Sequence, residues 1–119
     1  MIPFANRFHG HSSLRFVYKN GQVTRSRLAT LKSITNPHRT TPRFAVVVSK
    51  KVMKSAVRRN KIRRKIYEYL RTNMERLAKP QDIVIIVTSS EFLTMAPSEV
   101  RAQLEQLCES AHLYKTTHN

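Results

Sequence analysis

The sequence predicts an α+β fold in one domain, with helices and strands in the order α-β-β-α-β-α, and three observations lead to it. Two apolar runs, FAVVV at 44–48 and IVIIV at 83–87, have the length of β-strands. Two longer segments, at about 57–77 and 97–113, repeat apolar residues at helical spacing. The chain has 119 residues, which is enough for one modest hydrophobic core and too little for two.

The N-terminal part is expected to be an irregular basic arm, residues 1–11, followed by a short helix. Ser12 or Ser13 can cap this helix, because a serine hydroxyl accepts a hydrogen bond from a free backbone N–H of the first turn. The helix should end at Asn20, since Gly21 suits the position that follows a helix.

The next segment predicts strands joined by turns. A first strand is expected at about 23–35, and its alternation is only partial, so an extra hairpin strand within 23–49 remains open. Turns containing proline at 36–42 separate it from a second strand, Arg43–Ser49. Its two faces carry Phe44, Val46 and Val48 on one side and Ala45, Val47 and Ser49 on the other. A strand that is apolar on both faces is expected in the centre of a sheet.

The C-terminal half predicts a helix, a strand and a helix. The long helix should bury one stripe, made of Ile62, Ile66, Leu70, Met74 and Leu77. Lys79-Pro80 ends it, and an almost continuously apolar strand follows at Asp82–Thr88. Pro97 suits the first turn of the last helix, and residues 114–119 form a short tail. The inner face of the last helix should carry Val100, Leu104, Leu107, Cys108 and Ala111.

The charge of the chain is concentrated in its first half. Residues 1–67 contain seventeen Lys or Arg and no Asp or Glu, whereas residues 68–119 contain five against seven acids, which gives a net charge of +15. The segment Lys50–Lys65 alone holds nine of these cations. Repulsion among so many like charges favours binding to a polyanionic partner. Nucleic acid is the first candidate for this partner, and an anionic membrane is the second. No apolar run approaches the roughly 20 residues of a membrane-spanning helix, so we expect no membrane partner.

The position of these cations indicates a function. They lie where a strand leads into a helix, which fixes their geometry, and Arg58, Arg59 and Lys61 oppose the helix dipole at that end. Cations at the N-terminal end of a helix cost stability, and no structural gain offsets this cost here, which points to a binding surface. The sequence therefore predicts that this segment contacts RNA or DNA.

A protein active site is not expected. The histidines are scattered, at His9, His11, His38, His112 and His118, and none has metal-ligand spacing to the single cysteine. No pair of acids suggests a two-metal nuclease, so we predict no catalytic residue and no metal ligand in the protein. The lone Cys108 favours a reducing compartment, and MIPFANRF lacks the apolar stretch of a secretory signal, so a cytoplasmic protein is expected.

The segment VVVSKKVMKSAVRRNKIRRKIYEYL, residues 46–70, resembles the signature of the bacterial ribonuclease P protein family. In that family a strand ending in a Ser-Lys-Lys-like sequence leads into a helix with Arg-Asn-Arg and then Ile-Lys-Arg. The corresponding residues here are Arg59-Asn60-Lys61 and Ile62-Arg63-Arg64, with Lys in place of the last Arg of the first triplet. The likeness extends to FVYKNG at 16–21 and DIVIIV at 82–87.

The resemblance implies a two-layer α/β sandwich of the ribosomal protein S5 domain 2-like type, with a left-handed βαβ crossover. The general rule for such crossovers predicts the right hand. The resemblance also implies that the protein is a subunit of a ribonucleoprotein endonuclease that removes the 5′ leader from precursor tRNA. The catalytic centre of that enzyme is in the RNA. The open alternative is a basic ribosomal-type or other nucleic-acid-binding protein without a processing role.

The resemblance also implies which residues bind RNA. The contacts to the catalytic RNA are expected at Lys50, Lys51, Lys54, Arg58, Arg59, Asn60, Lys61, Arg63, Arg64 and Lys65. The contacts to the leader are expected in a cleft between the first helix and the sheet, at Phe16, Tyr18, Phe44 and Val46. The implied partners are one catalytic RNA per protein and the precursor tRNA, and the implied cofactor is Mg²⁺ held by the RNA. Residues 1–119 are thus predicted to be a single RNA-binding domain.

Overall fold

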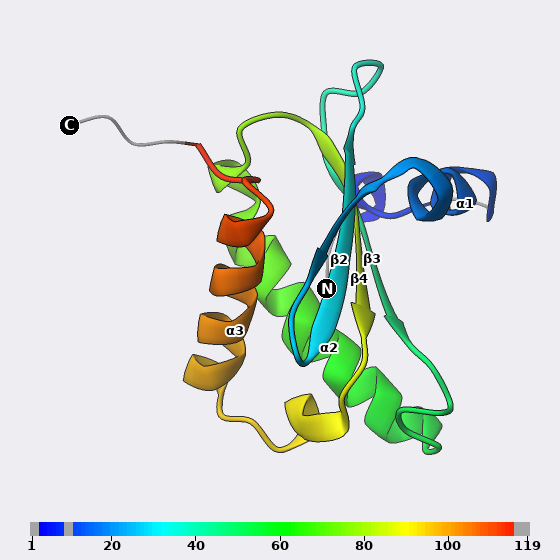
Figure 1. Ribbon diagram of the computed structural model, residues 1–119, viewed down its shortest axis with the longest axis vertical. Helices are drawn as coiled ribbons and strands as arrows, with labels where there is room; N and C mark the ends of the chain where they lie inside the picture. The colour runs from blue at the N-terminus through cyan, green and yellow to red at the C-terminus, as the bar shows by residue number, and fades with distance from the viewer. Residues whose placement is uncertain (1–2, 9–10, 116–119) are drawn as a thin grey trace.

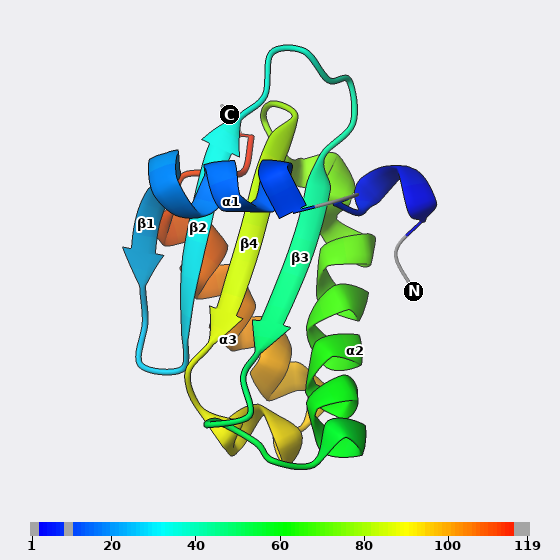
Figure 2. The ribbon, with the colours of Figure 1, turned by 90° about the vertical axis from the view of Figure 1, so that its right-hand side faces the viewer.

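The computed structural model describes residues 3–8 and 11–115. Its helices are α1 (His11–Asn20), α2 (Ala56–Asn73) and α3 (Pro97–Ser110), and its strands are β1 (Gln22–Arg25), β2 (Ala29–Thr35), β3 (Arg43–Val48) and β4 (Gln81–Val87). Short 3₁₀ turns occur at Phe4–Asn6, Met74–Arg76 and Ser90–Leu93. The four strands form one sheet, with α2 and α3 on one face and α1 across one end of the other (Figures 1 and 2).

The strand order in the sheet is β1-β2-β4-β3. β2 pairs antiparallel with both β1 and β4, and β3 pairs parallel with β4. The segment expected to hold one strand at 23–35 is thus a hairpin of β1 and β2, which settles the alternative that the sequence left open. The central apolar strand is β4, with five consecutive apolar residues at 83–87.

The prediction that the strand at 43–49 lies centrally is wrong, because β3 is an edge strand. Its edge is covered in other ways. The backbone N–H of Val46 donates to the hydroxyl of Tyr67 on α2 at 3.0 Å. Arg7 of the N-terminal segment forms a parallel bridge with Phe44. A covered edge tolerates the apolar sequence that is otherwise typical of a central strand.

The connection from β3 through α2 to β4 is left-handed. In Figure 2 both strands run downward, α2 returns behind the sheet, and β4 lies to the left of β3. This arrangement is the mirror image of the usual crossover. The fold that the resemblance implied is therefore confirmed.

The main core lies between the sheet and α2 and α3. It contains the expected inner stripe of α3 and, on α2, the side chains of Ile62, Ile66, Tyr69 and Leu70.

Ser55 caps α2, since its hydroxyl accepts the N–H of Arg58 at 3.3 Å. The helix α1 ends at Asn20, and Gly21 follows it. A Cβ at this position would lie 2.5 Å from the carbonyl oxygen of Val17, so only glycine fits.

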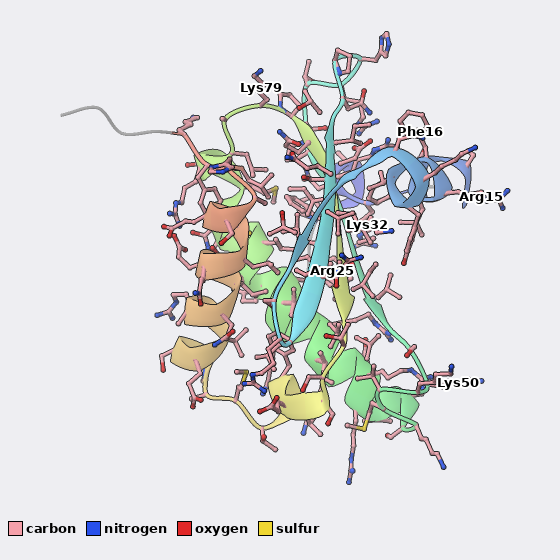
Figure 3. All side chains as sticks on the ribbon, in the orientation of Figure 1. Arg15, Phe16, Arg25, Lys32, Lys50 and Lys79 are labelled. Atoms are coloured by element: carbon pink, nitrogen blue, oxygen red, sulfur yellow. The ribbon has the colours of Figure 1, made fainter. Side chains whose placement is uncertain are left out.

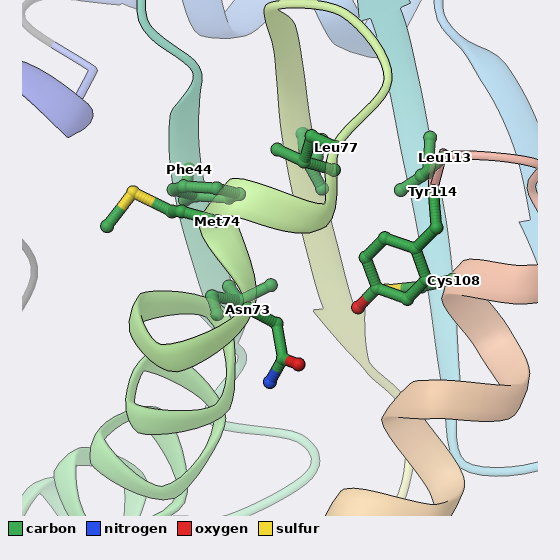
Figure 4. A pocket seen from close by; sticks show the side chains of 9 residues that line it. Phe44, Asn73, Met74, Leu77, Cys108, Leu113 and Tyr114 are labelled. Atoms are coloured by element: carbon green, nitrogen blue, oxygen red, sulfur yellow. The ribbon is translucent and has the colours of Figure 1, made fainter. Parts of the chain in front are cut away.

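A small cavity of about 10 Å³ lies near the C-terminal end of α2, between the sheet and α3 (Figure 4). It has room for about one water molecule. Cys108 of α3 borders it, and burial raises the pKa of this thiol to about 11. A thiol that stays protonated at neutral pH is a poor nucleophile, so the prediction of a buried structural cysteine is confirmed.

The two ends of the described chain are more ordered than the sequence indicates. In the N-terminal arm, the side-chain amide of Asn6 donates to the carbonyl of Pro42 at 2.7 Å. At the C-terminal end, Tyr114 forms a bridge with Leu77, and the N–H of Lys115 donates to the carbonyl of Arg76 at 2.8 Å. Tyr114 and Lys115, which were expected in a tail at 114–119, are therefore bound to the fold, and residues 116–119 lie outside the described residues.

Candidate nucleic-acid interface

Most of the predicted cations belong to the loop before α2 and to the first turns of that helix. Figures 1 and 2 show that this loop and the start of α2 lie at one end of the molecule. The exposed members are Lys50, Lys51, Lys54, Arg58, Lys61 and Arg64, together with Asn60, and we call them the α2 surface. Within the described part of the chain, none of these six cations forms a salt bridge; Glu68, Asp82, Glu91 and Glu105 pair with other arginines. The α2 surface is therefore open to an external anion.

The helix geometry places these charges opposite the core. Ile62, Ile66 and Tyr69 point inward, so Lys61 and Arg64, which are spaced by less than one turn, point outward. The first turn of α2 contains no acid, and its dipole alone would attract an anion. The cations add charge to an end of the helix that already favours phosphate.

Lys65 does not belong to this surface, which corrects the prediction. Its ammonium group is half-buried and donates to three backbone carbonyls of the connection between β4 and α3. The acceptors are the carbonyl oxygens of Phe92 at 3.1 Å, Leu93 at 2.7 Å and Met95 at 3.1 Å. An ammonium group has three donors, so Lys65 has none left for phosphate.

Arg59 and Arg63 are half-buried members of the same segment. One terminal nitrogen of Arg59, Nη1, donates to the carbonyls of Met53 at 3.0 Å and Lys54 at 2.8 Å. Arg59 therefore holds the loop that carries Lys50, Lys51 and Lys54 against the start of α2. Its contact with RNA stays a prediction, as does that of Arg63.

The second predicted surface lies on the sheet face that carries α1. Val17 of α1 and Val84 of β4 are both fully buried, and they hold the helix against the sheet. Lys32 of β2 pairs with Val84 in the ladder and points the same way. Its ammonium donates to the carbonyl of Tyr18 at 3.1 Å and lies 5.0 Å from the centre of the Tyr18 ring.

Beyond α1 this sheet face is half-open. The half-buried side chains on it, in ladder positions level with Val84 or two residues along, are Thr30, Lys32, Ala45, Val47 and Ile86. Together with Tyr18 they form what we call the sheet surface; Figure 2 shows the strands β2, β4 and β3, which carry the other residues, extending below α1. Its mixture of apolar side chains, an aromatic ring and a cation suits single-stranded RNA.

Phe16 and Tyr18 leave α1 on opposite flanks. Tyr18 lies against Lys32 on the side of the open sheet face. Phe16 is 55% exposed and lines a groove of about 480 Å³ on the other flank, beside the loop Thr35–His38. In Figure 3 the Phe16 and Lys32 side chains lie on opposite sides of α1. The structure therefore does not bring the two rings into one cleft.

Phe44 and Val46 are not on the sheet surface, which is a second correction. They are 2% and 6% exposed and pack in the main core beneath α2. Successive side chains of a strand point to opposite faces, so the residues of β3 that face the α1 side are Ala45 and Val47. The two predicted positions of β3 therefore face the main core and not the side of α1.

A buried ion pair, which the sequence analysis missed, anchors α1 to the sheet. The guanidinium of Arg43 donates to Asp82 through Nε at 2.9 Å and Nη2 at 2.7 Å. Asp82 also accepts from the amide of Asn36 at 3.0 Å, and Arg43 donates to the hydroxyl of Ser13 on α1 at 3.3 Å. Hydrogen bonding to Asp82 raises the pKa of Arg43. A signal was available, since Asp82 is the only acid in its strand.

The described residues contain no group of three His, Cys, Asp or Glu side chains that could hold a metal ion. Among the histidines, His38 and His112 are exposed, while His9 and His118 lie outside the described residues. Within the part of the chain that the structure covers, no helix is long and apolar enough to cross a membrane.

Comparisons with known proteins agree with this geometry. A family model described as Ribonuclease P matches residues 2–112. The ribonuclease P protein component of Prochlorococcus marinus (strain MIT 9215) is 31% identical over an aligned length of 127 residues, gaps included. This alignment covers 96% of this chain and 98% of that protein. That of Pseudanabaena sp. (strain PCC 6903) is 34% identical over 89 residues, which cover 75% of this chain and 77% of that protein.

Solved structures show the same fold. A Staphylococcus aureus RNase P protein mutant with defective mRNA degradation activity superposes with a TM-score of 0.83 at 25% identity, covering 92% of this chain and 91% of that one. The RNase P protein of Thermotoga maritima gives a TM-score of 0.75 at 27% identity, covering 87% and 96%. The match of the family model over nearly the whole chain, the relatives and the shared fold lead to one conclusion: this chain belongs to the ribonuclease P protein family.

Proposed function

We propose that this chain is the non-catalytic subunit of a ribonuclease P in which an RNA performs the cleavage. The observation that carries the proposal is the α2 surface, where six exposed cations lie in a fixed array without a salt bridge in the described structure. Binding there neutralises phosphates of the RNA and releases their counterions, which supplies affinity and makes it depend on salt. One protein binds one RNA.

The chemistry of cleavage belongs to the RNA in this proposal. The described residues contain no group of three His, Cys, Asp or Glu side chains that could hold a metal ion. Mg²⁺ held by RNA phosphates would supply the activated water and stabilise the leaving oxygen. The protein contributes by drawing crowded phosphates together, which lowers the concentration of Mg²⁺ that the folded RNA requires.

The sheet surface is proposed to hold the 5′ leader of precursor tRNA. A single strand of RNA presents unpaired bases, which stack on aromatic rings, and phosphates, which attract cations. Tyr18 and Lys32 offer these two groups side by side. Mature tRNA lacks the leader, so this contact distinguishes the substrate from the product.

Binding to the cognate RNA tests the proposal against the alternative of a general nucleic-acid-binding protein. We expect the chain to bind the RNase P RNA of its own organism at least about a hundredfold more tightly than an RNA duplex of equal length at the same salt concentration. One protein should saturate one RNA. Equal affinity for both would favour the general nucleic-acid-binding reading.

Replacing the ring of Tyr18 should weaken binding of the substrate and leave binding of the product unchanged. Stacking of a base on an aromatic ring contributes about 1–3 kcal/mol. We therefore expect Tyr18→Leu, which keeps apolar volume and helix propensity, to lower the affinity of the holoenzyme for precursor tRNA by about five- to hundredfold. The measurement compares the dissociation constants of precursor tRNA and mature tRNA.

Phe16→Leu is the matched comparison, because it removes a ring from the opposite flank of the same helix. If Phe16→Leu lowers affinity for precursor tRNA and Tyr18→Leu does not, the leader follows the groove beside Thr35–His38 instead of the sheet surface. Equal losses for precursor and mature tRNA would show that neither ring meets the leader.

A further inference from the structure

Val57 is an apolar side chain with no structural task in the described protein. It is 71% exposed at the second position of α2, directly after the cap Ser55 and Ala56. The two other large apolar residues near this end, Val52 and Met53, pack against the core, and Val57 does not. A β-branched residue is also a weaker helix former than alanine or lysine.

The surroundings of Val57 are cationic. On the helix it is spaced by one turn from Lys61 and by two turns from Arg64, so these three side chains follow one exposed stripe. Arg58 directly follows Val57 near the N-terminal end of α2, and Lys54 lies in the loop before the helix. An isolated surface valine needs no explanation, but this one lies inside the α2 surface.

We propose that Val57 is an RNA-contacting residue that packs on a ribose or on the face of a base of the RNase P RNA, an inference that rests on the proposed function of the α2 surface. Phosphates held at Lys61 and Arg64 bring the neighbouring riboses and bases of the same strand toward Val57, which lies one turn before Lys61 on this stripe. Burial of the valine then adds an apolar contribution to binding that the cations cannot supply. This contribution does not release counterions, so it does not depend on salt.

The test separates these two kinds of contact by their salt dependence. Val57→Thr keeps the shape and β-branching of the side chain and replaces one methyl group by a hydroxyl, and Val57→Ala removes both methyl groups. We expect each variant to raise the dissociation constant for the RNase P RNA of the same organism by about three- to twentyfold, which is the range for burial of part of an aliphatic side chain. The shift should be the same at every salt concentration, so that log–log plots are parallel to that of the unaltered protein.

Val23→Thr is the matched control, because Val23 is a second exposed valine, 42% exposed, on the edge strand β1 far from α2. It should bind the RNA alone like the unaltered protein. All three variants change exposed residues, and thermal unfolding should confirm that they fold. A dissociation constant within twofold of the unaltered value for Val57→Thr and Val57→Ala, or a slope changed by a full unit, would overturn the inference. Failure of the unaltered protein to bind this RNA would instead overturn the proposed function on which it rests.

Discussion

Replacing Arg58, Lys61 and Arg64 together with alanine should weaken binding to the RNase P RNA by about 10²–10³-fold at 0.1 M salt. Each side chain is exposed and forms no salt bridge in the described structure. Each lost phosphate contact lowers the slope of log affinity against log salt by roughly 0.7–0.9, so the slope should fall by about two to three units. Titrations of the RNA at several salt concentrations measure both quantities.

The same variant should fold at least as well as the unaltered protein. Alanine is a better helix former than any of the three, and removing cations from the N-terminal end of α2 relieves an unfavourable interaction with the helix dipole. The control replaces Lys79, Arg101 and Lys115, three exposed cations of other surfaces, with alanine. Figure 3 shows Lys79 at the opposite end of the molecule from Lys50. Both variants lose three charges, so an equal loss of affinity would mean that only net charge matters and that the α2 surface is no specific site.

Asp82→Ala should lower the free energy of unfolding by about 3–5 kcal/mol. It leaves the guanidinium of Arg43 buried without a counter-charge, since the side chains of Arg43 and Asp82 are only 12% and 5% exposed. For a domain of this size, such a loss lowers the melting temperature by roughly 10–20 °C. Because Arg43 also holds Ser13, α1 should loosen, and the sheet surface with it.

The control for this prediction is the exposed pair Arg27–Glu91, whose side chains are 71% and 52% exposed. Glu91→Ala should lower the free energy of unfolding far less than Asp82→Ala does, because solvent screens an exposed pair. The double substitution Arg43→Met with Asp82→Leu should recover part of the stability that Asp82→Ala loses, since no charge is then left buried. A small effect of Asp82→Ala would contradict the view that this pair anchors α1.

The sequence predicts the elements of the fold well because the apolar pattern of each one is strong. The runs at 44–48 and 83–87 are strands, and the inner faces of α2 and α3 are buried. The helix α2 ends earlier than expected, at Asn73, so Met74 and Leu77 of the predicted stripe lie beyond it and are only partly buried. The hairpin at 22–35 is harder to predict, because its first strand has only four residues and most of them are exposed to solvent. The edge position of β3 is not visible in its sequence, because the group that accepts the N–H of Val46 at this edge is the hydroxyl of Tyr67, twenty-one residues further along the chain.

The candidate site shows where local pattern fails. Charge density identifies the α2 surface, but it cannot tell that Lys65 turns toward the carbonyls of Phe92, Leu93 and Met95, because that contact depends on where the segment before α3 folds back. The alternation of side chains along β3 divides its residues into two sets that face opposite sides of the sheet. It does not tell which of the two sets faces α1. That choice is made by the larger apolar surface of α2 and α3, which takes Phe44 and Val46 into the core.

The most direct test of the central claim, that this protein assists a catalytic RNA and does not itself cleave, is the cleavage of precursor tRNA at low Mg²⁺ concentration. Purified protein freed of RNA, cognate RNase P RNA alone, and the two together are compared on one precursor with a leader of several nucleotides. We predict no cleavage by the protein, slow cleavage by the RNA, and fast cleavage by the mixture, with the advantage of the mixture shrinking as Mg²⁺ rises. Cleavage by the protein alone, or a mixture no faster than the RNA at low Mg²⁺, would contradict the account.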